Sequence, residues 1–273
     1  MNHLTELLSN SHGSAAAGAI PISFGQLALC LVFVVVVGAI SLRQALGLEK
    51  NLALGTVRSI AQLTLMGYVL RLLFALDSPW LMLAVFVVMT WFAADIVRGR
   101  VKKQNVAYFM PTLLVMQIVY FLVTCYVTGV IIRAEPWWMP QYFIPVGGMV
   151  AGNSMNALAI SLDRFFSDLK SARPAYEMQV TLGATPEEAS RDVFRNALRA
   201  GMIPSINSLM GAGIVSIPGM MTGQILAGGD PAEASRYQIV VMLMMVAATA
   251  LASFAVLHLV RRRCFTSYGR LKL

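Results

Sequence analysis

Long apolar runs separated by short polar stretches dominate the chain. A helix needs about 20 apolar residues to cross a bilayer, and the sequence offers seven candidate runs of this kind. They are residues 24–42, 53–76, 79–97, 108–132, 142–163, 202–228 and 237–260. Lipid offers the backbone no hydrogen-bond partners, so each crossing run is expected to be helical. The pattern therefore predicts an all-α, polytopic integral membrane protein with about seven transmembrane helices.

The composition supports a membrane protein and excludes other classes. The 273 residues are 58% hydrophobic and only 12% charged, whereas about 25% of the residues in a typical soluble domain are charged. A soluble enzyme and a disulfide-rich secreted protein are both excluded by this balance. The expected location is the cytoplasmic (inner) membrane, with lipid around the helices. The three cysteines are too scattered to indicate a zinc or iron–sulfur site: Cys30, Cys125 and Cys264.

The basic residues predict the orientation. With the N-terminus outside, all of the 21 lysines and arginines lie on the cytoplasmic side except Arg71, Arg133 and Arg236, as the positive-inside rule requires. The chain is therefore expected to be N-out and C-in. Basic residues on the cytoplasmic side account for the net charge of +8. The positive charge therefore gives no reason to expect a nucleic-acid partner. The expected parts are an extracytoplasmic tail (1–23), a transmembrane permease domain (24–262) and a cytoplasmic tail (263–273).

The longest loop, residues 164–201, is predicted to contain two helices around a tight turn. The first covers about 174–182, and Gly183 follows where a helix end favours a left-handed residue. Thr185, Pro186 and the glutamates after them match an N-cap, a first-turn proline and a capping box. The second helix is expected to reach about residue 200. Two interpretations stay open: an amphipathic connector on the lipid headgroups, or a rigid projection that docks on another protein.

The spacing inside this loop favours docking. It resembles the coupling pattern of ABC-type permeases, E-A-A-x3-G-x9-I-x-L-P, because Glu177, Gly183 and Val193 fall in register, whereas Arg195 and Asn196 replace the Leu-Pro ending. The chain lacks the G-x-x-x-x-G-K-[ST] loop that holds ATP phosphates. ATP and Mg²⁺ would therefore be bound by a separate cytoplasmic ATPase, and this chain would bind no cofactor. The expected coupling residues are Glu177, Gly183, Ala184, Thr185, Pro186 and Glu187.

Five blocks of sequence together resemble the FetB-like family of bacterial iron-export permeases, to which plant half-transporters for aluminium tolerance are related. The resemblance covers about residues 24–262. The blocks are residues 144–155 (IPVGGMVAGNSM), 182–186 (LGATP), 217–223 (IPGMMTG), 227–231 (AGGDP) and 237–241 (YQIVV). The resemblance implies a seven-span subunit that pairs with a separate ATPase and exports iron from the cytoplasm. Two copies of the permease are expected to pair.

Small and polar residues inside the fifth and sixth runs indicate where cargo would pass. The Gly148/Gly152 and Gly219/Gly223 pairs would let helix backbones approach closely, and Pro218 would break the long sixth run. Pro218, Gly219 and Gly223 are therefore the expected hinge. Amides at membrane depth are expected to face protein or an aqueous path. The expected substrate path is Met149, Asn153, Ser154, Met155, Asn156, Met220, Met221 and Gln224.

The transported species stays open at this stage. Thioethers favour copper(I) over iron, and methionine is also a pliable apolar filler, so no metal ligand is assigned. Other candidate functions are ABC-type export of another metal or of a small metabolite, and an ion-coupled secondary transporter. The last would need an intramembrane acid or an internal repeat, and neither is evident. No catalytic motif lies within a run, so an enzyme is not expected.

Overall fold

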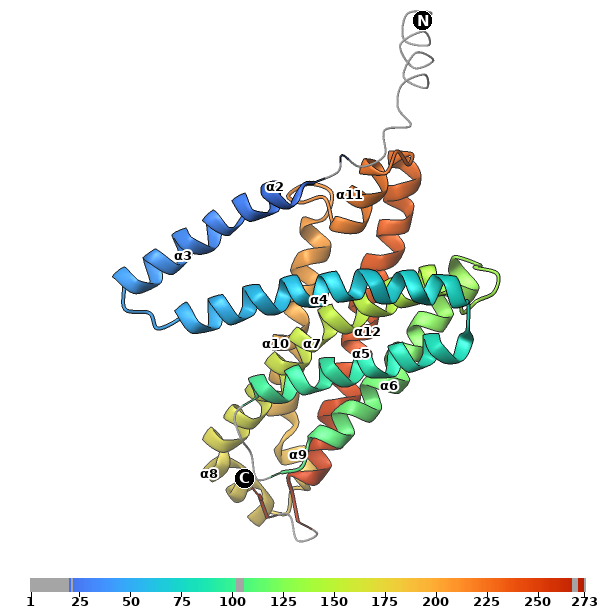
Figure 1. Cartoon of the computed structure of the whole chain (residues 1–273). Coiled ribbons are helices and arrows are strands. Elements are labelled where there is room, and N and C mark those ends of the chain that lie inside the picture. Colours follow the sequence, from blue (N-terminus) through green and yellow to red (C-terminus); the bar gives the residue numbers. More distant parts are fainter. Residues whose placement is uncertain (1–19, 21, 102–105, 267–269, 273) are drawn as a thin grey trace, which may run out of the picture. The chain divides into compact units, whose positions relative to one another are not determined.

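The structure is a computed structural model that describes residues 20, 22–101, 106–266 and 270–272 (Figure 1). The regular elements of the described residues are all helices, and β-structure within them is limited to two isolated β-bridges. They divide into two compact units. The smaller unit contains residues 1–76 and 222–234, and the larger contains residues 77–221 and 235–273. The two units are described separately below.

The smaller unit contains a helical hairpin. Helix α2 (Phe24–Leu29) leads into α3 (Leu31–Arg43), and α4 (Glu49–Leu76) returns after a short turn. The Ser41 hydroxyl fixes this turn, because it donates to a Glu49 carboxylate oxygen at 2.8 Å and accepts from the Leu48 amide at 3.2 Å. At the start of α2, Ser23 and Gln26 form a capping box. Local hydrogen bonds therefore define both the start and the reversal of the hairpin.

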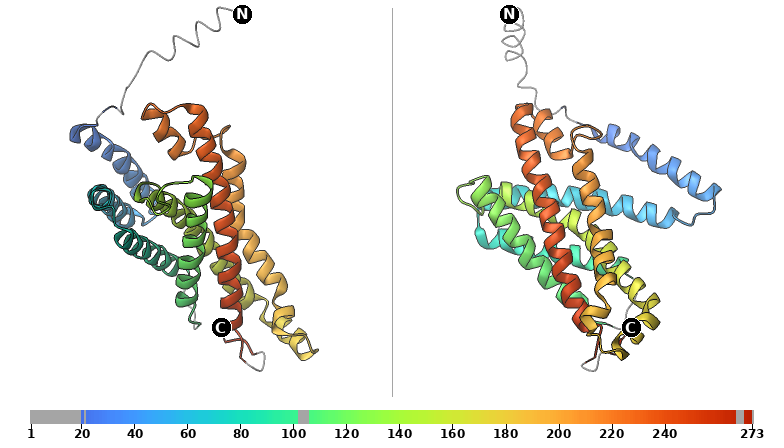
Figure 2. Two further views of the ribbon diagram at one scale, coloured as in Figure 1. Left: turned by 90° about the vertical axis from the view of Figure 1, so that its right-hand side faces the viewer. Right: turned by 180° about the vertical axis from the view of Figure 1, so that it is seen from behind.

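The larger unit packs around a long central helix. Helix α7 contacts α5, α6 and α10, and Figure 2 shows these helices from two further sides. The helix bounds in this unit are α5 (Pro79–Arg100), α6 (Phe109–Tyr126) with a π-helical extension η2 (Val127–Ile131), α7 (Pro140–Ser171), α8 (Arg173–Thr181), α9 (Pro186–Ala189) and α10 (Arg191–Gly211). Helices α11 (Gly219–Leu226) and α12 (Pro231–Arg263) have residues in both units.

Helix α6 buries a mixture of polar and apolar side chains and exposes an apolar outer stripe. Tyr120 and Thr124, four residues apart, are fully buried, whereas Leu114, Ile118 and Leu122 form an outer stripe that is about 60% exposed. Residues four apart share one side of a helix, so the most apolar side of α6 faces outward. A soluble protein would bury such a stripe. The arrangement is that of a helix surrounded by lipid.

Two glycines allow close helix contacts inside the larger unit. A Cβ added to Gly147 would lie 2.8 Å from Phe86 Cε2, and one added to Gly201 would lie 1.9 Å from Ser161 Oγ and 2.6 Å from the Ala157 carbonyl oxygen. Gly201 therefore places α10 directly against α7. Of the predicted glycine pairs, Gly148 has van der Waals contact, because a Cβ added there would lie 3.6 Å from the Met89 sulfur. At Gly152, Gly219 and Gly223 an added Cβ has no neighbour within 4 Å among the described residues.

The predicted membrane-crossing runs agree with the helices except in one place. Six described helices are long and apolar enough to cross a membrane: Gly25–Arg43, Glu49–Leu76, Pro79–Arg100, Phe109–Ile131, Pro140–Ser171 and Pro231–Arg263. The seventh predicted run, 202–228, is not one helix, because α10 ends at Gly211 and α11 begins at Gly219. The count of seven crossings and the N-out, C-in orientation stay predictions.

The predicted loop 164–201 is shorter than expected. Helix α7 continues to Ser171 and α10 begins at Arg191, so both neighbouring helices extend into this segment. What lies between them is α8, a turn and α9, residues 173–190, which we call the elbow. The sequence could not reveal the extension of α7, because its last turns carry charged residues that resemble a loop. The division at residues 23 and 262 stays a prediction.

Candidate functional site

The elbow begins with a helix that ends in a defined turn. Gly183 has φ +99°, a left-handed conformation that glycine adopts without the steric cost of a Cβ. Its amide donates to the Val180 carbonyl and the Ala184 amide donates to the Gln179 carbonyl, both at 3.0 Å. These two hydrogen bonds form a Schellman motif, which satisfies carbonyl groups at the end of α8. The predicted turn at Gly183 is confirmed.

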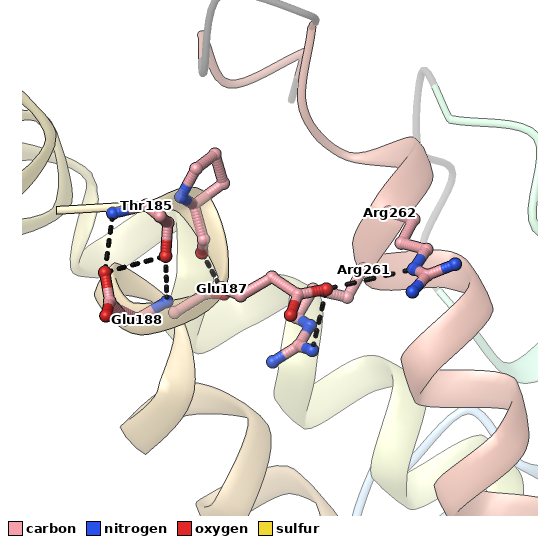
Figure 3. Close-up of polar contacts among 7 residues, drawn as sticks. Thr185, Glu187, Glu188, Arg261 and Arg262 are labelled. Atoms are coloured by element: carbon pink, nitrogen blue, oxygen red, sulfur yellow. Dashed lines mark hydrogen bonds and ion pairs between the residues drawn. The ribbon is translucent and has the colours of Figure 1, made fainter.

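The second half of the elbow starts with the predicted capping box (Figure 3). The Glu188 amide donates to Thr185 Oγ1 at 3.2 Å, and the Thr185 amide donates to Glu188 Oε2 at 2.9 Å. The Thr185 hydroxyl also donates to Glu188 Oε2, at 2.8 Å, and the two hydrogen bonds that the carboxylate accepts from Thr185 lower the pKa of the Glu188 carboxyl below its usual value. Pro186 occupies the first turn of α9. The turn and the cap together give the elbow a specified shape.

The elbow is joined to α10 with almost no intervening loop. Only Ser190 separates α9 from α10, and its buried hydroxyl donates to the Pro186 carbonyl at 2.6 Å. Helix α10 then continues for 21 residues to Gly211. The elbow is thus attached directly to the helix that packs on α7. Glu177, another predicted coupling residue, is paired with Arg173 at 2.8 Å within α8.

The end of α12 and the segment after it hold the elbow. The rings of Tyr176 and Phe265 stack at 4.9 Å between centroids, and the carboxylate of Glu187 pairs with Arg261 at 3.4 Å and Arg262 at 3.8 Å (Figure 3). Arg261 also lies over the Phe194 ring, 4.9 Å from its centroid. The sequence does not predict these contacts between the elbow and the end of α12, because basic residues such as Arg261 and Arg262 indicate only the orientation of the helix in the membrane.

The predicted polar residues on α7 divide between two sides of the helix. Asn153 donates to Ser205 Oγ of α10 at 3.3 Å. Ser154 is fully buried on another side and shares a hydrogen bond of 3.1 Å with Thr249 of α12. The structure therefore brings Asn153 to the α7–α10 boundary and places Ser154 in the boundary with α12. The two residues do not form one polar cluster.

Asn156 lies one turn beyond Asn153 and is exposed. Its side chain accepts a hydrogen bond from Arg100 at the end of α5 and donates to the Gly152 carbonyl at 3.4 Å. The link to Arg100 was not predicted, because the two residues are far apart in the sequence. Met149 and Met155 are partly exposed on the same helix. Asn153 is thus bonded to α10, whereas Asn156 is bonded to the end of α5.

The predicted break in the sixth run is present in the structure. Between α10 and α11 the chain forms a tight loop in which Gly213 has φ +83° and donates to the Ser216 carbonyl at 2.9 Å. Pro218 and Gly219 follow directly. The loop exposes apolar side chains, with Ile214 90% exposed. The break is therefore confirmed, and movement at it stays a prediction.

The remaining predicted path and hinge residues lie on α11. Met220 and Met221 are half-buried, and the Met221 amide donates to Gln238 Oε1 of α12 at 3.3 Å. Gln224 and Gly223 belong to the smaller unit, where the Gln224 carbonyl accepts from the Gly229 amide at 2.9 Å. Among the described residues, no group of three or more His, Cys, Asp and Glu side chains could hold a metal ion.

The helices, with their apolar outer faces, define a multi-pass membrane protein, as expected for the cytoplasmic membrane. Comparison with known proteins identifies the family. Residues 24–265 match the model described as "Uncharacterised protein family (UPF0014)", and the chain belongs to this family of membrane permeases. No solved structure matches the chain.

Three relatives are similar to the chain over most of its length. A Synechocystis protein named "UPF0014 membrane protein slr1647" is 37% identical over 84% of this chain and 88% of its own. The Escherichia coli "Probable iron export permease protein FetB" is 33% identical over 90% and 93%. The Arabidopsis thaliana "Protein ALUMINUM SENSITIVE 3" is 32% identical over 90% and 88%. The similarity supports a membrane transport protein.

Proposed function

We propose that this chain is the membrane-spanning subunit of an ABC-type exporter and that a separate cytoplasmic ATPase docks on the elbow. ATP and Mg²⁺ would be bound and used by that partner. The observation that carries the proposal is the construction of the elbow. It has a fixed turn at Gly183 and a capped second half, and only Ser190 separates α9 from α10. Force applied there reaches the α7–α10 boundary directly.

The α7–α10 boundary is the proposed route of the cargo. Asn153 and Ser205 lie at this boundary, and Asn156 lies one turn further along α7. Amides at membrane depth are costly unless they face protein or water, so the position of Asn153 and Asn156 three residues apart on one face of α7 supports a polar route. Ser154 is omitted from this route, because its hydroxyl is fully buried against Thr249.

Iron is the first cargo to test, since one similar protein is named as an iron export permease. Another metal or a small metabolite is the alternative. The direct experiment purifies the chain with its ATPase, reconstitutes both in vesicles and measures which metals or metabolites stimulate ATP hydrolysis. Iron export would be supported if iron stimulates ATP hydrolysis and is carried away from the side of the membrane on which ATP is supplied. Stimulation by a different compound would identify that compound as the cargo instead of iron and would still support ATP-driven transport.

Two copies of the chain are proposed to form the permease. Small residues let helices approach closely in lipid. Within the described part of the chain, Gly152, Gly219 and Gly223 each have open space where a Cβ would stand. Such faces are available to a second copy. Cross-linking of single cysteines at these three positions would test the pairing.

Gly183→Arg tests the docking of the ATPase. Arginine is strained at φ +99° and places a long cation at the tip of the elbow. We expect the variant to insert into the membrane but to lose ATPase association and transport. Gly99→Arg is the matched control, because Gly99 is an exposed glycine near the end of α5 with open space around it. Full ATPase coupling in Gly183→Arg would contradict the proposal.

An uncoupler experiment separates ATP-driven transport from ion-coupled transport. Transport by the reconstituted complex should continue when the proton gradient is collapsed, provided that ATP is present. Transport that stops with the gradient while ATP persists would favour a secondary transporter.

A further inference from the structure

A pocket lies where the elbow meets the end of α12. Its volume is about 280 Å³, and it is lined by Pro186, Glu187, Arg261, Arg262, Phe265 and Thr266. Pockets for small-molecule ligands usually have volumes of about 300–1,000 Å³, so this one lies at the lower edge of that range and has room for a carboxylate side chain. All of its lining residues belong to the larger unit.

The pocket has more positive charge than its own residues neutralise. Two guanidinium groups share one carboxylate, that of Glu187, at 3.4 and 3.8 Å. Charge-assisted hydrogen bonds of good geometry are about 2.7–2.9 Å long, so both contacts are loose. The Glu187 side chain is 55% exposed and is therefore partly turned to solvent.

Arg261 is the least satisfied of these groups. Its side chain is only 10% exposed, and its Nε has no hydrogen-bond partner among the described residues. A buried cation is stable only when its donors are paired. The aromatic ring of Phe194 covers the guanidinium but accepts no conventional hydrogen bond from it. Within the described part of the chain, Arg261 therefore has one buried donor without an acceptor.

We propose that the pocket binds an aspartate or glutamate side chain of the ATPase partner, and that the elbow and the end of α12 together form the docking surface. This inference rests on the proposed function. A carboxylate would add an acceptor for the terminal nitrogens of the Arg261 guanidinium, one of which has only the loose contact with Glu187. It would also pair with Arg262, which is 65% exposed and can reorient. The pocket's excess positive charge makes an acidic side chain the matching occupant.

Docking through this pocket would link two helices to one partner residue. Glu187 belongs to the elbow, which continues into α10, whereas Arg261 and Arg262 belong to α12. An entering carboxylate competes with Glu187 for the two arginines. Engagement of the ATPase would therefore loosen the contact between the elbow and α12.

The first test measures binding of the ATPase to the full-length permease in detergent. Arg261→Gln should weaken binding by about 30-fold or more, because the arginine is buried, and Arg262→Gln should weaken it several-fold. Arg263→Gln is the matched control. Arg263 neighbours the pair but does not line the pocket, and its Nη1 donates to the Ala107 carbonyl. Equal affinities for wild type, Arg262→Gln and Arg261→Gln would overturn the proposal.

A second test does not depend on how well the Arg261 variant folds. In Arg262→Lys, a carbodiimide can join the new amine to a carboxylate in direct contact with it. We expect a cross-linked peptide that contains residue 262 and an acidic residue of the ATPase, and no such peptide from Arg263→Lys. Coupling only to Glu187 of the same chain, or no coupling, would overturn the proposal.

The outcomes separate this inference from the function on which it rests. If the wild-type chain binds no ATPase, both proposals fail. If it binds the ATPase but Arg262→Lys gives no cross-link to it, only the pocket proposal fails. Binding to phosphatidylglycerol vesicles that Arg262→Gln abolishes, with ATPase binding unchanged, would make the pocket a lipid headgroup site and would also overturn the proposal.

Discussion

Single residues determine how closely the helices of the larger unit approach. Gly201 has Ser161 and the Ala157 carbonyl at distances where no Cβ fits, so this glycine fixes the spacing of α7 and α10. Gly148 and Gly152 were the residues predicted for this role from their spacing. The sequence shows which residues are small. It does not show which of them face a neighbour, because the helix rotation depends on packing with distant segments.

Gly201→Ala should destabilise the protein. The added methyl group overlaps Ser161 and a main-chain oxygen that cannot move without shifting α7. Overpacking of this kind costs about 1–3 kcal/mol. The measurement is the apparent Tm of the purified protein in detergent. Gly152→Ala is the control, since open space surrounds this position and alanine favours helix by about 1 kcal/mol. An unchanged Tm for Gly201→Ala would contradict the close contact.

Elements with local signals were predicted well from the sequence. The Thr185 cap, the Gly183 turn and the break before Gly219 all depend on residues within a few positions of one another. The contact of α12 with the elbow depends on Arg261 and Phe265, which are far from the elbow in the chain. No local pattern reports such a contact, so the sequence predicted the elbow and missed what holds it.

The cap of α9 should depend on pH. Hydrogen bonds from Thr185 lower the folded-state pKa of Glu188, so the cap stabilises the elbow above the unfolded pKa of about 4.3. This contribution is lost as the pH falls through the lowered folded pKa. Hydrogen exchange of the amides of residues 187–190, corrected for intrinsic rates, should be slower in wild type than in Glu188→Gln at pH 7.

That difference in exchange should vanish in acid. Thr185→Ala removes the capping oxygen, which should lower the free energy of opening of the same amides by about 1 kcal/mol. Their exchange should therefore be about fivefold faster. Glu177→Gln is the control, because that residue pairs only with Arg173 in an exposed position. Identical exchange in wild type and Thr185→Ala would exclude a role for the cap.

A cysteine beside the elbow can report whether α12 releases it. Cys264 is fully buried, and burial raises the pKa of its thiol to about 12. In a variant with Cys30 and Cys125 replaced by serine, maleimide labelling at pH 8 should therefore be slow, because the reactive thiolate is scarce. Phe265→Ala removes the ring stacked on Tyr176 and should speed labelling at least several-fold. Rapid labelling without this substitution would show that the tail is already released.

At the scale of the whole molecule, composition defines the class and charge predicts the orientation. Six helices are long and apolar enough to cross a membrane, and the broken run that contains α10 and α11 would make a seventh crossing. Apolar content alone predicted this run. It did not reveal that α10 extends back to Arg191, because the first turns of that helix are charged.

The orientation predicts which side of the membrane the elbow faces. A cysteine at Gln179, which is exposed on α8, should react with a membrane-impermeant reagent only when the cytoplasmic side is open. A cysteine at Ala232, between α11 and the body of α12, should react in intact spheroplasts. Labelling of both positions from one side would exclude a crossing by the broken run, and labelling of position 179 from outside would reverse the orientation.

The continuity of α10 has a mechanical consequence. Its 21 residues make a rod about 30 Å long, and Gly201 holds the rod against α7 near its middle. Such a rod is a lever with its fulcrum at Gly201. The two arms are about equal, so a push that swings the elbow by a few ångströms would swing the loop after Gly211 by a similar amount in the opposite direction. Pro204, which removes a main-chain donor just beyond the fulcrum, would set how much of that swing is absorbed by bending.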